Sequence, residues 1–503
     1  MSVKSLVKST LLLGSSSAAN ALVGILRVKA LALLVGPAGL GLLGTLSGLA
    51  TVGTTLFAVG ADTSGTRRLA LDRDDPESVY RLRRLMLLIA AIHGAASIAL
   101  FWLIAAPLSR WAFGSDAYAG EVATLGFVVA VSLLAGLQIA VLQGLGRVRD
   151  IARIGLTSSI ISTALGLAAV WEFGIPGVIV LLLAQPLLSA LLAARLAPAK
   201  PEQTTLASNR SLLLSHWRDM MREGAPFMLS YLALAFMPLG VRALVIRTEG
   251  LEAAGHFHAA WTMSVIYVGF LLNAMSADYF PRLTGVVSDK AKAISLMNDQ
   301  ITVGIIIGGP ALLLVMATAP WIVPLLYSKA FGPAVAIVEW QALGNLMKIA
   351  GWPIAFLSMA RGRSKQFLAL ELAWTSLFLL LVWAGLPVLG LEATGMAFAA
   401  SCTVFLFLQT VVAWKTFGFT LRRDVVLIVA GYVATGVVIL AAARESAGMQ
   451  AAVGATAAVV LGLAGLRHML AKTGVEGRIG AGAARMFARL GWPVAPPSAH
   501  SAH

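Results

Sequence analysis

Charged residues and cysteine are scarce in this chain of 503 residues. Asp, Glu, Lys and Arg together account for 12% of the sequence, about half of the 25% that a typical soluble domain carries. The chain therefore lacks the charge to cover a water-facing surface. Its single cysteine, Cys402, excludes an intrachain disulfide and a cysteine-based zinc site. The histidines show no H-E-x-x-H spacing, and His256 and His258 are expected at a membrane interface rather than on a metal.

Motifs for enzymatic chemistry are also missing. The sequence has no P-loop, no nucleophile elbow and no catalytic acid pair, which predicts a protein that is not an enzyme. The stretch LLVGPAGLGLLG does resemble a dinucleotide-binding turn, with glycines at Gly39, Gly41 and Gly44. That turn requires a preceding strand, whereas apolar runs flank this one. We expect Gly36 and Pro37 to end a helix, and the three glycines to let two helices approach closely.

Apolar residues dominate the chain. They make up 58% of it, and the mean hydropathy is +0.85. About 20 apolar residues cross a bilayer, so we predict an all-α integral membrane protein with about fourteen transmembrane helices. The predicted spans are residues 6–35, 39–61, 84–106, 122–145, 154–172, 176–197, 225–248, 255–276, 300–327, 335–360, 366–386, 391–414, 425–443 and 449–470.

Basic residues are distributed unevenly between these spans. Of the 38 Lys and Arg, thirty fall in the tails and even-numbered connections, five lie at membrane depth, and three fall in odd-numbered connections: Arg110, Lys329 and Arg444. The positive-inside rule then predicts that both termini are cytoplasmic. The net charge of +15 is explained as topogenic charge facing anionic membrane lipids, so no nucleic-acid partner is expected.

The chain also repeats itself at long range. Asp62 in GADTSGTRRL and Asp278 in SADYFPRLTG both end a span and are 216 residues apart. Six spans per copy predict two parallel repeats around a central cavity, plus two extra C-terminal helices. The expected divisions are an N-lobe at 1–200, a cytoplasmic linker at 201–224, a C-lobe at 225–420, the extra helices at 421–471, and a partly disordered cytoplasmic tail at 472–503.

Five cations fall inside predicted spans: Arg27, Lys29, Arg242, Arg247 and Lys348. Exposing such a side chain to lipid at the centre of a helix costs about 2.5–3.5 kcal/mol. Lys29 and Arg247 lie near enough to a span end to serve either as anchors or as ligands. We predict that Arg27, Arg242 and Lys348 line a wet cavity for an anion, or form buried ion pairs. Phosphate suits the bidentate fork of arginine.

Acids at similar depth are fewer: Glu371, Glu339, Asp62 and Asp278. A buried glutamate such as Glu371 is a proton or sodium site, or equally a counter-ion for a cation. If Lys348 forms a buried ion pair instead of lining the cavity, Glu339 or Glu371 is its partner. Asp62 and Asp278 stand beside arginines, so inner-mouth salt bridges or helix ends are expected of them before a role in substrate binding.

Four stretches carry a family resemblance: GPAGLGLLG from Gly36, YFPRLTGVVSDK from Tyr279, WQALGNLMKIAG from Trp340 and FLALELA from Phe367. In this order, the body over residues 1–420 resembles the polysaccharide flippases of the multidrug/oligosaccharidyl-lipid/polysaccharide exporter superfamily. The similarity is greatest to the Wzx-type translocases of O-antigen and enterobacterial common antigen units. Asn345 stands where such proteins often carry aspartate, which argues against an acid-dependent coupling step there.

The resemblance implies a flippase for an undecaprenyl-diphosphate-linked oligosaccharide (an O-antigen, common antigen or exopolysaccharide repeat unit) in the bacterial cytoplasmic membrane. The diphosphate is expected on Arg27 and Arg242, with Lys348 assisting. It further implies no cofactor, power from H⁺, Na⁺ or the membrane potential, and a polysaccharide polymerase and chain-length machinery as partners. A lipid II flippase and a multidrug cation antiporter remain alternatives within the superfamily. A membrane-embedded glycosyltransferase is the enzyme alternative.

Overall fold

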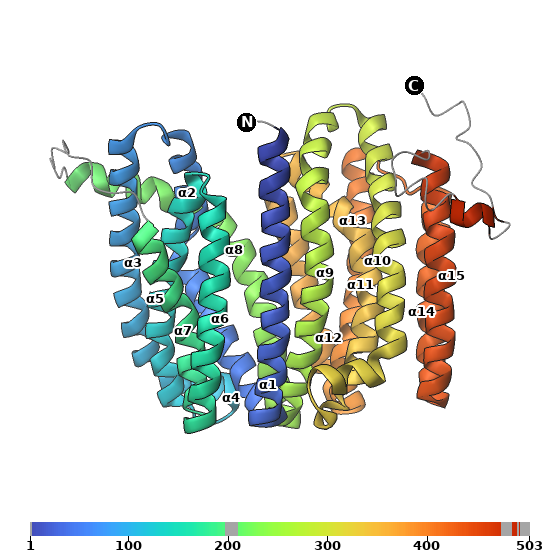
Figure 1. Cartoon of the computed structure of the whole chain (residues 1–503), viewed down its shortest axis with the longest axis horizontal. Coiled ribbons are helices and arrows are strands. Elements are labelled where there is room, and N and C mark those ends of the chain that lie inside the picture. Colours follow the sequence, from blue (N-terminus) through green and yellow to red (C-terminus); the bar gives the residue numbers. More distant parts are fainter. Residues whose placement is uncertain (1–2, 197–209, 474–484, 490–491, 493–503) are drawn as a thin grey trace. The chain divides into compact units, whose positions relative to one another are not determined.

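The computed structural model describes residues 3–196, 210–473, 485–489 and 492, and this part of the chain is helical and contains no strand (Figure 1). The prediction of an all-α protein is therefore confirmed. The predicted linker is described only from residue 210, and the predicted tail lies outside the described residues apart from 472–473, 485–489 and 492. The helices are α1 Val3–Ala58, α2 Ala61–Leu71, α3 Pro76–Leu103, α4 Ala105–Phe113, α5 Ala119–Gly144, α6 Val148–Phe173, α7 Gly177–Leu196, α8 Arg210–Glu249, α9 Leu251–Val286, α10 Lys290–Leu326, η1 Lys329–Phe331, α11 Ala334–Ala360, α12 Ser364–Leu389, η2 Gly390–Glu392, α13 Ala393–Phe417, α14 Arg423–Glu445 and α15 Ala447–Thr473.

Ten segments of the described chain are long and apolar enough to cross a membrane. They overlap twelve of the fourteen predicted spans, because Leu22–Ala58 and Lys365–Phe417 each cover parts of two. The predicted spans at 255–276 and 335–360 form α9 and α11, which are not among the ten. Polar side chains such as Lys348 lower the hydropathy of α11. The chain is a multi-pass membrane protein, and the count of fourteen stays a prediction.

α1 consists of two helices joined by a turn at Gly36. Gly36 has φ +64° and ψ −169° and Pro37 follows it, so the glycine adopts a backbone that side chains disfavour and the proline begins the next helix. This is the helix end that the sequence predicts. Gly250, with φ +90°, makes the equivalent break between α8 and α9.

Local geometry recurs in the two sequence copies. Gly146 and Gly362 have φ +69° and +67°, and Gly174 and Gly390 have φ +62° and +59°; the members of each pair are 216 residues apart. Left-handed glycines end helices, so equivalent helices of the two copies end at equivalent places. These matches agree with the predicted repeats. The predicted lobe and linker boundaries themselves stay a prediction.

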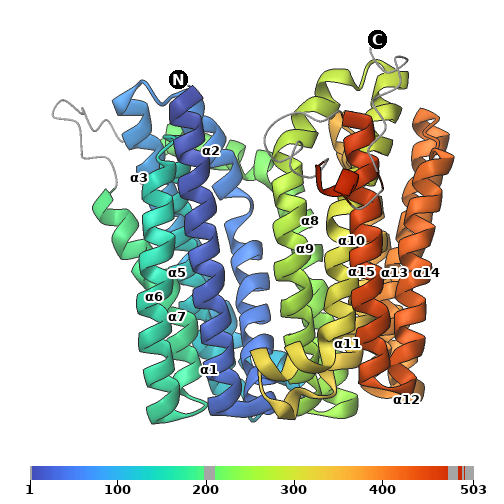
Figure 2. The ribbon, with the colours of Figure 1, turned by 45° about the vertical axis from the view of Figure 1, so that its right-hand side comes forward.

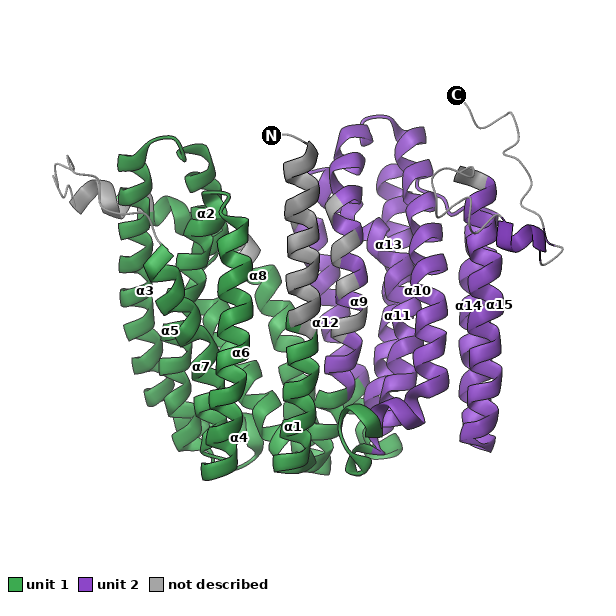
Figure 3. Ribbon diagram, viewed as in Figure 1, with its two compact units in different colours: residues 1–259, 324–331, 382–391 green, residues 260–323, 332–381, 392–503 purple. Residues whose placement is uncertain are grey.

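Residue contacts group the chain into two compact units (Figure 3). Unit 1 comprises residues 1–259, 324–331 and 382–391, and unit 2 comprises 260–323, 332–381 and 392–503. In unit 1, α5 packs against α3 and α7, and α7 packs against α6 (Figures 1 and 2). In unit 2, α11 packs against α13 and α14, and α14 packs against α15.

Candidate functional site

A row of glycines in the second half of α1 brings it into contact with α8 and α9. A Cβ atom on Gly41 would lie 2.2 Å from the carbonyl oxygen of Leu251, and one on Gly44 would lie 2.6 Å from the His258 ring. A Cβ atom on Gly48 would lie 2.8 Å from Nη1 of Arg242. The expected role of Gly41 and Gly44 in close helix packing is therefore seen. The row also makes room for a guanidinium.

Arg242, from α8, is the most buried of the predicted cationic ligands. It is 5% exposed, and its Nε and Nη1 atoms are buried without a hydrogen-bond partner in the described part of the chain. His258 lies close enough for the arginine charge to act on its ring. A buried guanidinium normally has its donors satisfied, so Arg242 is unusual in having two nitrogens without an acceptor among the described residues.

Arg27 occupies the corresponding position in the first copy. It precedes Gly36 by nine residues, and Arg242 precedes Gly250 by eight, which places both about 12–14 Å from their turns at 1.5 Å per residue. Arg27 is half-buried, and its Nη1 donates to Oε1 of Gln185 in α7 at 3.1 Å. A neutral amide leaves the arginine charge available. Within the described residues no hydrogen bond or ion pair joins Arg27 to Arg242.

Lys29 and Arg247 contact the carboxyl ends of helices. Nζ of Lys29 donates to the carbonyl oxygen of Leu325 at 2.8 Å, in the last turn of α10. Nη2 of Arg247 donates to the carbonyl oxygen of Arg110 at 3.3 Å, in the last turn of α4. Cations satisfy free carbonyls and the partial negative charge at such ends. These contacts favour the anchoring role over the ligand role for both.

Lys348 lies in unit 2 and contacts an aromatic ring. Its Nζ is 5.2 Å from the ring centroid of Trp374 in α12, a cation–π geometry. Its charge also acts on Glu371, which is buried one turn before Trp374. The ion pair expected with Glu371 or Glu339 is not formed within 4 Å among the described residues. Whether Lys348 assists a diphosphate stays a prediction, since it belongs to the other unit.

Glu339 and Asn345 are both buried in α11. Oε1 of Glu339 accepts from Nε2 of Gln450 in α15 at 2.5 Å, and the same amide donates to the carbonyl oxygen of Met316 at 2.7 Å. Between them, Gln341 accepts from the hydroxyl of Ser264 at 2.6 Å. α11 thus carries three buried polar side chains, Glu339, Gln341 and Asn345, within an apolar unit. The coupling or counter-ion role of Glu339 stays a prediction, as does the argument against an acid-dependent coupling step at Asn345.

The two repeated aspartates lie at exposed positions on their helices. Asp278 pairs with Arg282 at 3.1 Å. Asp62 lies in the first turn of α2, where a carboxylate is favoured, and the neighbouring Arg68 pairs instead with Glu223 at 2.8 Å. One aspartate therefore forms the expected salt bridge and the other is a helix-end residue.

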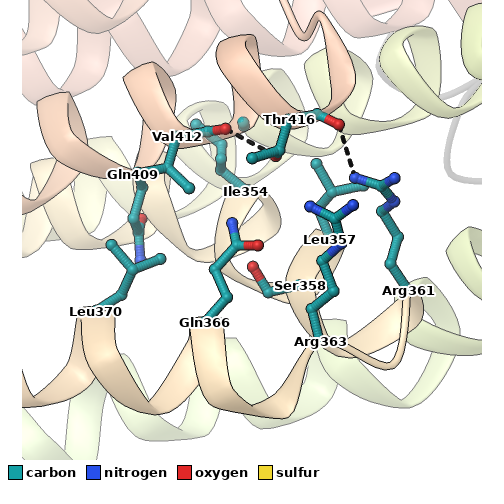
Figure 4. A pocket seen from close by; sticks show the side chains of 11 residues that line it. Ile354, Leu357, Ser358, Arg361, Arg363, Gln366, Leu370, Gln409, Val412 and Thr416 are labelled. Atoms are coloured by element: carbon teal, nitrogen blue, oxygen red, sulfur yellow. Dashed lines mark hydrogen bonds between the residues drawn. The ribbon is translucent and has the colours of Figure 1, made fainter.

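A polar cleft in unit 2 is too small for a substrate. It lies between the ends of α11, α12 and α13, where Nη1 of Arg361 donates to the carbonyl oxygen of Thr416 at 2.9 Å (Figure 4). Its cavity measures about 10 Å³, which holds about one water molecule. Arg147 binds the carbonyl oxygen of Leu196 from the equivalent turn of the first copy. A contact from an arginine to a helix-end carbonyl therefore recurs in both copies.

Several partners were not identified from the sequence. Gln185 and Gln450 are isolated amides in apolar spans, and their rarity there was a usable signal. Two other partners gave no sequence signal, because aromatic residues are common in such helices. They are Trp374, which contacts Lys348, and His258, which lies beside Arg242. His258 is packed against α1 rather than lying at an interface.

The arrangement of helices is that of a known class of transporters. The lipid II flippase MurJ in an inward closed conformation has a TM-score of 0.70 at 14% identity, covering 92% of this chain and 100% of that one. An inward-facing multidrug resistance MATE transporter of the MOP superfamily has a TM-score of 0.65 at 16% identity, covering 79% and 94%. The protein therefore has the MurJ- and MATE-like transporter fold.

The family follows from the sequence comparisons. A family described as polysaccharide biosynthesis protein matches residues 30–336, more than half of the chain, and the chain belongs to this family. The lipid III flippases of Escherichia coli (strain K12) and Shigella flexneri are each 23% identical to it over 413 residues, covering 80% of this chain and 96% of theirs. These matches are to flippases and transporters, which are not enzymes, and they bear out the prediction that the protein is not an enzyme.

Proposed function

We propose that the protein flips an undecaprenyl-diphosphate-linked oligosaccharide, an O-antigen, common antigen or exopolysaccharide unit, from the inner to the outer leaflet of the bacterial cytoplasmic membrane. The family and the lipid III flippase relatives support a lipid-linked sugar as the substrate class. The observation that carries the proposal is the buried Arg242 guanidinium with two unpartnered nitrogens. A diphosphate supplies the negative charge and the paired oxygens that this group lacks.

The cost of burying an unpaired charge explains why such a site binds an anion. An unpaired ion inside a protein carries an effective desolvation penalty of several kcal/mol. An incoming phosphate removes that penalty and adds charge-assisted hydrogen bonds worth about 1.5–3 kcal/mol each. Arg27, held only by the neutral Gln185, is proposed as the second phosphate ligand. Lys348 is proposed to assist in holding the diphosphate.

Transport is proposed to run by alternating access of the two six-helix repeats, with both termini in the cytoplasm. Power comes from an H⁺ or Na⁺ gradient or from the membrane potential, with the buried Glu371 and Glu339 as the groups available to take a cation. A polysaccharide polymerase and chain-length machinery are proposed partners, because flipped units must be joined outside.

A lipid II flippase is the second candidate, favoured by the TM-score of 0.70 to MurJ. It shares the diphosphate chemistry and differs in the sugar. A multidrug cation antiporter is the third, and the MATE-like fold agrees with it. The predicted ligands Arg27 and Arg242 are cations, which repel a cationic drug and so argue against it.

The proposal is tested by replacing Arg242 and Arg27 with alanine and with lysine in a strain whose own copy is deleted. Lipid-linked intermediate and surface polysaccharide are then quantified. We expect Arg242→Ala to reduce export about tenfold or more and to accumulate intermediate, since one lost charge-assisted contact is worth about 1.5–3 kcal/mol. Arg242→Lys retains the charge but loses the fork and is expected to be intermediate.

Arg444→Ala is the matched control. Arg444 is exposed in the last turn of α14, so its removal changes the net charge equally without touching the site. The phosphate-binding role is refuted if Arg27→Ala and Arg242→Ala, at wild-type protein levels, both give normal polymer and accumulate no intermediate.

A further inference from the structure

A cationic cavity lies in unit 1, and neither Arg27 nor Arg242 lines it. It measures about 340 Å³ and is bounded by α2, α3 and α8, within the range of about 300–1,000 Å³ that ligand pockets occupy. Three arginines and a serine line it together with two acids: Arg67, Arg68, Arg81, Ser78, Asp72 and Glu223. Its α2 and α8 residues lie beyond the candidate spans, and Ser78 and Arg81 are in the first turns of α3. The cavity therefore opens where helices leave the membrane.

A tight contact between backbones fixes the α8 wall of this cavity. A Cβ atom on Gly224 would lie 2.3 Å from the carbonyl oxygen of Val59, and one on Gly60 would lie 2.4 Å from the carbonyl oxygen of Gly224. The break between α1 and α2 thus packs directly on α8. This contact sets Glu223 opposite α2, where Oε1 accepts from Nη2 of Arg68 at 2.8 Å. Backbone packing, rather than side-chain position alone, therefore fixes this wall of the cavity.

The charges lining the cavity are only partly matched. Arg68 is paired with Glu223, and the hydroxyl of Ser78 donates to Asp72 at 2.8 Å. Arg81 is 3.8 Å from Glu77, a weak exposed pair. Arg67 forms no ion pair with any described residue. Three arginines against two carboxylates leave the lining with a net charge of +1, and Arg67 and Arg81 are the arginines without a close ion pair among the described residues.

We propose that this cavity binds the phosphate of an anionic membrane lipid. Arginine forks and a serine hydroxyl are the groups that bind phosphate oxygens. The membrane source follows from the position at the helix ends and from Leu71, which lines the cavity while 75% exposed, so that an acyl chain meets apolar surface beside the charges. The site does not include Arg27 or Arg242. The lipid-binding proposal can therefore be tested without knowing the transported substrate.

Glu223 competes with the lipid in this arrangement. The hydrogen bond from Arg68 lowers the pKa of Glu223. The carboxylate therefore stays ionised at neutral pH and remains paired with the Arg68 guanidinium. A bound phosphate has to share or displace it. Replacing Glu223 with glutamine removes the competing charge and keeps the side-chain shape, and it therefore changes binding in the direction opposite to an arginine loss.

The experiment uses the purified full-length protein in neutral detergent. Native mass spectrometry counts bound phosphatidylglycerol during a titration, with phosphatidylcholine of the same acyl chains as the reference lipid. The variants are Arg67→Gln combined with Arg81→Gln, Glu223→Gln, and the control Arg84→Gln. Arg84 is exposed on α3 one turn after Arg81 and does not line the cavity.

We expect the double arginine variant to bind phosphatidylglycerol about tenfold more weakly, which corresponds to about 1.4 kcal/mol. Glu223→Gln is expected to bind it more tightly, and Arg84→Gln to match the wild type. Equal weakening in Arg84→Gln, or no gain in Glu223→Gln, overturns the site. A parallel arm titrates inorganic phosphate by thermal shift. If phosphate reproduces the order of the variants while phosphatidylglycerol does not bind, the lipid source is refuted.

Discussion

Replacing Gly255 with alanine is expected to disrupt the contact between α1 and the start of α9. A Cβ atom there would lie 1.8 Å from the carbonyl oxygen of Pro37, while ordinary contacts begin at 3.4 Å. The two backbones therefore have to separate by about 1.6 Å for this one contact. Neither atom belongs to a side chain that can rotate away, so relief requires moving a helix.

The magnitude follows from the cost of overpacking, about 1–3 kcal/mol for an added methyl group in a tight core. We place Gly255→Ala at the upper end of that range, because its neighbour is backbone. Gly41→Ala, 2.2 Å from the carbonyl oxygen of Leu251, is expected to cost about 2 kcal/mol. One outward movement of α9 relieves both clashes. The double variant is therefore expected to cost about 1–2 kcal/mol less than the two single losses combined.

Unfolding of the purified protein in a denaturing detergent, followed by tryptophan fluorescence, measures these differences. Gly136→Ala in α5 is the matched control, because nothing lies within 4 Å of its added Cβ atom. There alanine is favoured over glycine by about 0.5–1 kcal/mol, so the control moves in the opposite direction. Wild-type stability in Gly255→Ala, or strict additivity in the double variant, refutes the reasoning.

Three further substitutions are expected to rank by burial. Gln450→Ala removes the donor to the buried Glu339 and is expected to lower the free energy of unfolding by about 1–3 kcal/mol in the same assay. Glu339→Gln alone is not expected to reproduce that loss. Tyr279→Phe deletes a buried hydrogen bond to the carbonyl oxygen of Pro353 and should cost about 1 kcal/mol; no loss contradicts that bond. Asp278→Asn removes an exposed salt bridge and should change stability by less than about 1 kcal/mol, with a shift that fades in high salt.

The helical class and several turns of this protein could be predicted because their signals are local. Low charge and long apolar runs define the class. Gly36 followed by Pro37 identifies a helix end from two adjacent residues, and the structure has the turn there. The glycines that follow were predicted as a group. Of these, Gly41 and Gly44 contact α9, whereas Gly39 meets Val35 across the turn.

Partners of the charged residues could not be predicted, because they come from distant parts of the chain. Gln185 is 158 residues from Arg27, and Leu325 is 296 residues from Lys29. Hydrophobic periodicity gives the face of a helix but not what lies opposite. For Lys348 the sequence left open an anion cavity or a carboxylate partner, and the structure has the ring of Trp374 beside its Nζ, since an aromatic ring also accommodates a cation at that depth.

The bond from Gln450 has a consequence for how this protein changes over generations. α15 lies in the extra helical pair, outside the duplicated body. Its Gln450 side chain nevertheless donates a hydrogen bond to Glu339, a buried acid of that body. Tyr432 of α14 likewise fills the space beside Gly309, where a methyl group would lie 2.6 Å from its ring. A variant without α14 and α15 leaves Glu339 without this donor and Gly309 without the ring that packs on it. Deleting α14 and α15 is therefore expected to require compensating substitutions in α10 and α11.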